Sequence, residues 1–340
     1  MKYRPNTARL GVALAALAAV AACSDVNRTP TAPGHPSADQ SPSLSVSPSH
    51  FEVLHGAVIH ATVENAHAAM HAARPTRSTE LYYHGGTGGI GVETTPKVYL
   101  VLWGSQWSSD PSGEASRLQS FLGDVGGSSW LNSVTQYCQG VSSGTYFCNG
   151  AGTAAGNGVN FAGVLTDNGS AAPSQPTQSQ LAAEAVKAAG LFGNTTAASN
   201  AATQYVIATA HGYSSAGFGT QYCAYHSSTS SSYGTIAYTN LPYITDAGSS
   251  CGANYNGLGA NAGITIVEGH ELAETITDQF PSSGWLDGSG AENGDKCAWI
   301  STGNQGASAS VSLNGMPFPV QSLWSNAFNG GQGGCVLSYP

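Results

Sequence analysis

The run KVYLVLW at Lys97–Trp103 decides the fold class, because it is short, continuous and apolar. Its Val, Leu, Tyr and Trp side chains predict a buried strand. A second run of this kind, QYVIATA, occupies Gln204–Ala210, and Val159–Leu165 is a further strand candidate. We therefore expect at least three strands before residue 211.

Helical patterns separate these strands. Glu114–Val125 carries apolar residues at helical spacing, and Gln178–Phe192 is Ala-rich and ends before a glycine, as helices often do. Trp130–Tyr137 is a further helix candidate. Strands alternating with helices predict an α/β domain with a largely parallel or mixed sheet flanked by helices. Ser, Gly, Tyr and Asn dominate Gly212–Gly259, and we expect a long loop-rich segment there.

Cysteine usage points to an oxidising compartment. Apart from Cys23 the chain has six cysteines, at positions 138, 148, 223, 251, 297 and 335. An even number in an exported chain favours disulfides, and no Cys-x-x-Cys spacing supports a structural zinc site. Pairing of nearest neighbours, 138–148, 223–251 and 297–335, is the simplest of the possible arrangements.

The first residues have the composition of a secretory signal, with basic residues followed by a short apolar run. We expect a signal peptide over residues 1–22. The run ends in Val-Ala-Ala before Cys23, which resembles the lipobox of bacterial lipoproteins, so Cys23 is the predicted lipid anchor. Residues 23–80 are rich in Pro, Ser and Ala and predict a disordered tether or pro-segment. The protein is therefore expected outside the cytoplasm, on the cell envelope or secreted.

Residues 81–340 are the length of one domain and carry little charge. They contain four basic residues against fourteen acidic ones. So few cations cannot neutralise a row of phosphates, which argues against a nucleic-acid partner. The only predicted contact with a membrane is the lipid anchor.

The segment Ile264–Asp278, ITIVEGHELAETITD, is a predicted helix whose two sides differ in chemistry. At about 100° per residue, Leu272, Ile276 and other apolar residues share one arc. The acidic residues and His270 share the other. We expect the apolar arc to pack on the sheet. Seven of the fourteen acidic residues lie between Glu268 and Asp295, and nothing else in the domain resembles this cluster.

His270 and Glu274 are spaced i, i+4, which places two potential metal ligands on one helix face. The His-Glu-x-x-His helix of zinc peptidases uses the same spacing, with a glutamate general base where this chain has Glu271. Glu274 replaces the second histidine of that motif, and both imidazole and carboxylate bind Zn²⁺. We therefore predict His270 and Glu274 as metal ligands and Glu271 as the catalytic base. A solvated acidic helix face is the alternative.

The third ligand is expected from the loop Gly284–Cys297. Asp295 is the first choice and Glu292 the second, whereas Asp278 lies about 12 Å along the helix axis from His270, too far to share one ion. Zn²⁺ is the predicted metal. Ca²⁺ is possible, but it prefers six or more oxygen ligands and gains little from a histidine.

His211 follows a predicted strand directly, at the end where α/β sheets place functional residues. It could be an imidazole ligand or an oxyanion stabiliser, and a structural histidine is the favoured alternative. No Gly-x-Ser-x-Gly sequence occurs, so a serine hydrolase has no support.

Several motifs resemble the exordium, or phosphate-induced protein, family and its bacterial relatives. They are YYHGG from Tyr82, KVYLVLWGSQW from Lys97, GHELAETITD from Gly269, and GW-x-D followed by EN-GD-x-C from Gly284. The resemblance covers most of residues 81–340 and implies an extracytoplasmic, exordium-like domain. It implies no settled catalytic activity.

Two functions follow from these patterns. The first is a zinc-dependent hydrolase, most plausibly a metallopeptidase that acts on peptides with metal-activated water. The second is a non-catalytic protein associated with the cell wall or with carbohydrate polymers, in which the acidic centre holds a structural ion.

Overall fold

The computed structural model describes residues 80–338. The predicted signal peptide, the lipid attachment at Cys23 and all but the last residue of the predicted tether lie outside the described residues. Within residues 80–338, no helix has the length and apolar character needed to cross a membrane.

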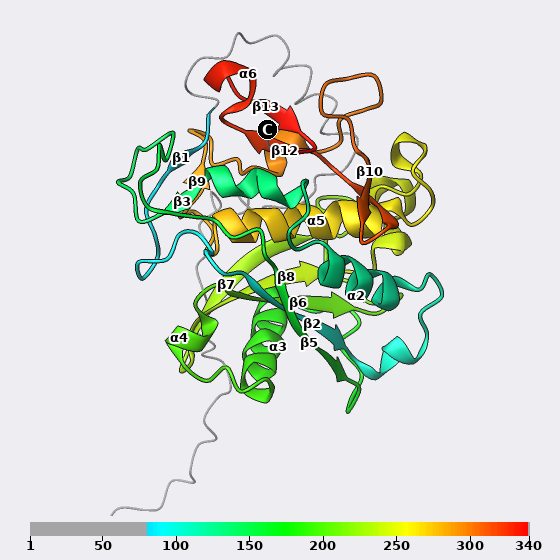
Figure 1. Cartoon of the computed structure of the whole chain (residues 1–340). Coiled ribbons are helices and arrows are strands. Elements are labelled where there is room, and N and C mark those ends of the chain that lie inside the picture. Colours follow the sequence, from blue (N-terminus) through cyan, green and yellow to red (C-terminus); the bar gives the residue numbers. More distant parts are fainter. Residues whose placement is uncertain (1–79, 339–340) are drawn as a thin grey trace, which may run out of the picture. The chain divides into compact units, whose positions relative to one another are not determined.

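A five-stranded sheet forms the centre of the domain (Figure 1). Its order is β5 (Asn160–Asp167), β2 (Lys97–Trp103), β6 (Thr203–Thr209), β8 (Gly234–Leu241) and β7 (Tyr225–Ser231). The first four strands are parallel to their neighbours, and β7 is antiparallel to β8 at one edge. The expectation of a mixed α/β sheet flanked by helices is confirmed.

Both faces of the sheet are buried, because its central strands β2 and β6 carry apolar residues on both sides. On β2, Val98, Leu100 and Leu102 belong to one core, and the alternate residues belong to the other. Helix α3 (Gln178–Leu191) covers one face, whereas α2 (Glu114–Asp124) and α5 (Ala262–Thr277) cover the opposite face (Figure 1). The result is three layers, in which the continuous apolar runs form the middle layer.

The helices begin where side chains satisfy their first amide groups. Thr177 and Gln180 form a capping box at the start of α3. At the start of α2, Asp110 accepts hydrogen bonds from the amides of Glu114 and Ala115. The expected helix at Trp130–Tyr137 is instead a short 3-10 helix, η4 (Leu131–Gln136).

The expectation of a long loop between Gly212 and Gly259 is wrong. This segment contains β7 and β8, which pair in register as a hairpin closed by Ser232 and Tyr233. The Ser-rich β7 lacks the apolar run of a central strand because it lies at the edge of the sheet. This correction matters for the candidate site, since β7 begins beside α5.

A third set of elements covers the side of α5 that faces away from the sheet (Figure 1). It consists of antiparallel pairs formed by β10 (Ala309–Leu313) with β11 (Met316–Val320), β12 (Leu323–Ser325) with β13 (Gly334–Val336), and β1 (Tyr82–Tyr83) with β9 (Trp285–Leu286). The remaining elements are β3 (Cys138–Gln139), β4 (Thr153–Ala154), η3 (Ser105–Ser108), α4 (Ala197–Asn200), η5 (Ile244–Cys251), η6 (Tyr255–Gly257), η7 (Asp295–Cys297) and α6 (Phe328–Gly331).

Three disulfides connect the expected nearest neighbours, Cys138–Cys148, Cys223–Cys251 and Cys297–Cys335. The second one precedes β7 directly. The third joins the loop after α5 to β13. Both therefore fix segments that flank the acidic helix.

Candidate metal centre

All sixteen residues of α5 are buried, including Glu268, His270, Glu271 and Glu274. The acidic arc of this helix is therefore enclosed by the protein as well as the apolar arc. The sheet lies on one side of α5, and α2, η4 and β11 contact it from the others. A solvated acidic face is excluded, because the carboxylates lie inside the domain.

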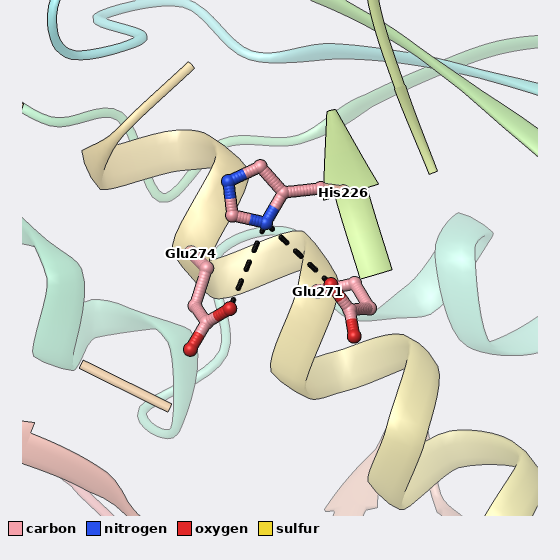
Figure 2. Close-up of side chains that lie close together, drawn as sticks. All are labelled: His226, Glu271 and Glu274. Atoms are coloured by element: carbon pink, nitrogen blue, oxygen red, sulfur yellow. Dashed lines mark ion pairs between the residues drawn. The ribbon is translucent and has the colours of Figure 1, made fainter. Parts of the chain in front are cut away.

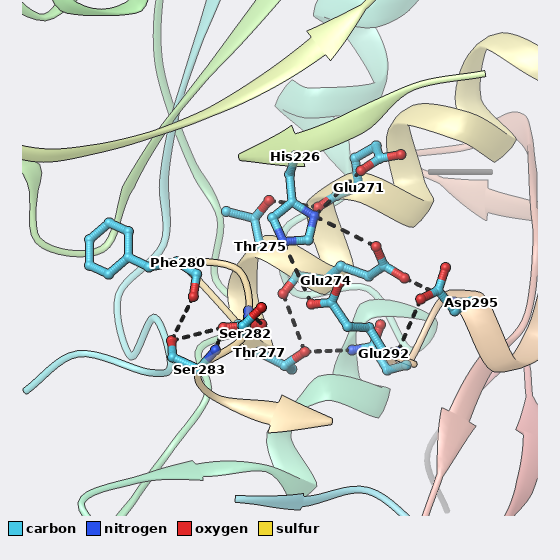
Figure 3. Close-up of polar contacts among 12 residues, drawn as sticks. His226, Glu271, Glu274, Thr275, Thr277, Phe280, Ser282, Ser283, Glu292 and Asp295 are labelled. Carbon is cyan, nitrogen blue, oxygen red and sulfur yellow. Dashed lines mark hydrogen bonds and ion pairs between the residues drawn. The ribbon is translucent and has the colours of Figure 1, made fainter. Parts of the chain in front are cut away.

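Side chains from three segments meet around the C-terminal half of α5 (Figure 3). Helix α5 contributes His270, Glu271 and Glu274, β7 contributes His226, and the loop after α5 contributes Glu292 and Asp295. Three subsets have potential ligand atoms within 4.8 Å of one another: His226 with Glu271 and Glu274, His226 with Asp278 and Glu292, and His270 with Glu274 and Asp295. A buried His/Glu/Glu group of this kind could hold a metal ion.

The structure brings His270, Glu274 and Asp295 together, as expected for three ligands of one ion. The Nε2 atom of His270 lies 2.9 Å from Oε1 of Glu274 and 3.6 Å from Oδ1 of Asp295. The i, i+4 spacing accounts for the first contact. The backbone amide of Asp295 donates to Oε1 of Glu274 at 2.9 Å, which holds the loop against the helix.

The protonation of His270 follows from its contact with Gln321. The side-chain amide of Gln321 donates to the carbonyls of Gly294 (2.7 Å) and Ser322. Its Oε1 atom therefore faces Nδ1 of His270, at 3.1 Å, and can only accept. Nδ1 carries the proton, so in the neutral imidazole the Nε2 lone pair points at two carboxylates. A proton or a metal cation must lie between them.

Without a metal the proton would take that place. Burial acts to lower the pKa of His270, but the negative charge of Glu274, followed by Glu271 and Asp295, outweighs it and raises the pKa to about 10. A bound cation would replace this proton, since metal ligands must be deprotonated.

His226, at the start of β7, was not predicted as a site residue. Its Nδ1 atom lies 3.5 Å from Oε2 of Glu271 and 3.6 Å from Oε2 of Glu274 (Figure 2). Its Nε2 atom lies 3.6 Å from Oε1 of Glu292. One imidazole thus connects the helix to the loop. The run TIAYTNL that follows Gly234 was the available signal, because its β-branched and aromatic residues predict a strand that pairs back on residues 225–231.

Glu271 and Glu268 are fully buried, and none of their carboxylate oxygens makes a hydrogen bond. Burial raises the pKa of Glu271 well above its usual range, although His270 opposes this shift. Burial alone raises the pKa of Glu268 to about 8. A buried carboxylate without hydrogen bonds costs several kcal/mol or binds a proton or a cation. Only Glu271 of these two belongs to a potential ligand group.

The other acidic residues of the segment have partners within the protein. Asp278 accepts hydrogen bonds from the amides of Ser282 and Ser283 and from the hydroxyl of Ser283. Asp287 pairs with Lys296 at 2.7 Å. Burial opposes ionisation of Asp287, but Lys296 keeps its pKa below the usual range. The positive charge of Lys296 therefore neutralises Asp287 and not the carboxylates around His270 and His226.

The loop that carries Glu292 and Asp295 is held in place by Asn293. Its side-chain amide donates to the carbonyl of Ala273 and to the hydroxyl of Thr277, both on α5. The backbone carbonyl of Asn293 accepts a hydrogen bond from the backbone amide of Trp324 on β12. The Cys297–Cys335 disulfide fixes the end of the loop. Such supports orient ligands before a metal binds.

Gly294 lies directly against the ligands. A Cβ atom at this position would be 2.9 Å from Oε1 of Glu274 and 2.9 Å from Nδ1 of His270. Its backbone is in the ordinary helical region, with φ −78° and ψ −47°. The glycine is therefore required by the close approach of the side chains and not by backbone strain.

His211 lies apart from these groups. Its Nδ1 atom contacts Oδ1 of Asp246 at 2.5 Å, and the second oxygen of Asp246 accepts from the amide of Gly212. His211 is half exposed and does not occur in any potential ligand group among the described residues. These contacts agree better with a structural role for His211 than with a role as a metal ligand.

No family model, no curated protein and no solved structure matches this chain. The resemblance to the exordium family therefore stays a prediction.

Proposed function

We propose that the protein is an extracytoplasmic, zinc-dependent hydrolase, and most specifically a metallopeptidase. The observation that carries the proposal is the orientation of His270, whose Nε2 lone pair faces the carboxylates of Glu274 and Asp295. Two histidines beside carboxylates favour Zn²⁺ over Ca²⁺, because calcium gains little from imidazole. The exordium-like motifs and the disulfides agree with a location outside the cytoplasm.

In this proposal His270, Glu274 and Asp295 hold the ion, and Glu292 supports His226. A bound zinc ion would supply a water molecule of lowered pKa. Glu271 would accept a proton from the attacking water and pass it to the amide nitrogen of the peptide bond that breaks. The absence of hydrogen bonds to Glu271 supports this role, because no donor of the protein occupies its carboxylate.

The complete burial of His226, His270, Glu271 and Glu274 favours a second candidate function. A substrate must reach a catalytic ion, whereas a structural ion needs no access. In the second proposal the ion stabilises a non-catalytic protein of the cell wall.

Glu271→Gln separates the two functions. The substitution keeps the shape of the side chain and removes the basic oxygen. An enzyme should retain the zinc ion held by His270, Glu274 and Asp295 and lose about 10²–10⁴-fold in turnover, the usual contribution of a positioned acid–base group. Cleavage of a peptide library by the full exported protein is the assay.

Glu268→Gln is the matched control, because Glu268 is equally buried and lies one turn away outside the ligand groups. It should cleave at the wild-type rate. Cleavage that survives in Glu271→Gln would remove Glu271 from the mechanism. A zinc-loaded wild-type protein that cleaves nothing in the library would favour the structural ion.

A further inference from the structure

Glu274 lies between the two histidines of the cluster. Its Oε1 atom faces Nε2 of His270 at 2.9 Å, and its Oε2 atom faces Nδ1 of His226 at 3.6 Å. The histidines come from separate elements, α5 and β7. A carboxylate that presents its two oxygens to two different imidazoles has the arrangement of a bridging metal ligand.

We propose that the cluster holds two divalent transition-metal ions bridged by the Glu274 carboxylate. The first ion lies at His270, Glu274 and Asp295. The second lies at His226, Glu271 and Glu274. The inference deepens the proposed function, which requires only the first ion.

The second position has an observation of its own in its favour. Glu271 is fully buried, makes no hydrogen bond, and directs Oε2 toward Nδ1 of His226 (Figure 2). An ion between Glu271 and His226 would satisfy this carboxylate. Contact through Oε2 leaves Oε1 of Glu271 available to accept a proton, so the proposed role as a base is preserved.

The orientation of His226 agrees with this assignment. Its Nε2 atom faces Oε1 of Glu292, which is the carboxylate–histidine contact that commonly fixes the tautomer of a metal ligand. With the proton on Nε2, the Nδ1 lone pair faces Glu271 and Glu274. The third potential ligand group is less suited to an ion, because Asp278 already accepts three hydrogen bonds.

Charge balance also favours a second divalent ion. Glu271, Glu274, Glu292 and Asp295 contact the two histidines directly or lie beside them. Four ionised carboxylates carry four negative charges, and two divalent ions neutralise them. Lys296, the basic residue of the following loop, is paired with Asp287. The two ions of known two-metal sites lie about 3.5–4 Å apart, a spacing that one bridging carboxylate spans.

The test is the number of zinc equivalents bound by the full exported protein. Metal-free protein is saturated with Zn²⁺, freed of excess by gel filtration and analysed for zinc. His226→Ala with His270→Ala should bind two equivalents fewer than the wild type, and His226→Ala alone should bind one fewer. Subtracting the zinc content of each variant from that of the wild type removes the contribution of zinc held by histidines elsewhere. His211→Ala is the control and should lose no zinc.

A loss of one equivalent in the double variant would overturn the two-ion inference and leave the proposed function standing. A loss of none would overturn both. As a measurement that does not depend on the folding of variants, the wild type is also loaded with Mn²⁺ and examined by electron paramagnetic resonance. Two bridged ions should give an exchange-coupled spectrum, and the spectrum of isolated Mn²⁺ at saturation would contradict the inference.

Discussion

Helices α3 and α5 lie on opposite faces of the same sheet, and both bury acidic residues (Figure 1). On α3, Glu184 pairs with Lys187 one turn later, and Lys187 also pairs with Asp167 at the end of β5. On α5, the buried carboxylates of Glu271 and Glu274 face His226 and His270. The α3 acids thus find a cation within the chain. The α5 cluster needs a proton or a metal ion from outside it.

The largest expected effect is on metal binding. Glu274→Gln removes the charged carboxylate shared by both histidines, so zinc affinity should fall by more than the roughly 100-fold that supporting residues contribute. Glu184→Gln on α3 is the matched control and should bind zinc as the wild type does. Competition with a chelator of known affinity measures both. Equal affinities in the two variants would mean that the contrast between the helices has no bearing on metal binding.

A smaller effect is expected at Gly294. Gly294→Ala places a methyl group 2.9 Å from Oε1 of Glu274 and from Nδ1 of His270, so these ligands must shift. Zinc affinity should decrease by about 10–100-fold, the range for residues that position ligands. Gly158→Ala is the control, because its Cβ would meet no atom within 4 Å and its backbone has no positive φ. If Gly294→Ala bound zinc like Gly158→Ala, the ligand positions inferred here would be wrong.

The smallest effect concerns the pH dependence of stability on the α3 side. Burial raises the pKa of Glu184 from 4.5 to about 7, and Asp167 adds to this while Lys187 opposes it. The folded protein therefore binds this proton more tightly than the unfolded chain, so the contribution of Glu184 to stability is greatest below pH 4.5 and declines as the pH rises toward 7.

Glu184→Gln should remove this part of the pH dependence. Urea unfolding at pH 4.5 and pH 7 is the measurement, and the loss of stability between the two should be smaller in the variant. An unchanged or steeper decline would show that Lys187 keeps Glu184 ionised throughout. In that case the α3 side is a simple ion pair.

The sequence predicted the parts of the fold that depend on local pattern. The bounds of β2 agree with the expected strand, and those of β6, α2, α3 and α5 differ by no more than two residues at either end. Continuous apolar runs and helical spacing predict these elements without knowledge of their neighbours in the fold. The same patterns placed His270 beside Glu274, because that contact spans a single helical turn.

The parts that depend on tertiary packing were not predictable from one sequence. The Ser-rich β7 becomes a strand because β8 pairs with it, so its contribution of His226 to the cluster depends on contacts distant in sequence. Likewise, the helical wheel shows that α5 has an acidic arc, but not that β7, β11 and the loop at Glu292 enclose it. Asp295 and Glu292 were expected because their loop follows the helix directly and ends at a disulfide.

X-ray absorption spectroscopy at the zinc edge tests the central claim most directly. The claim is that histidine and carboxylate side chains around α5 hold the metal, while all six cysteines of the domain are in disulfides. The zinc-loaded protein should show only nitrogen and oxygen neighbours at about 2.0–2.2 Å, with the multiple-scattering pattern of imidazole. Sulfur neighbours at about 2.3 Å, or a zinc shell without imidazole, would contradict the account.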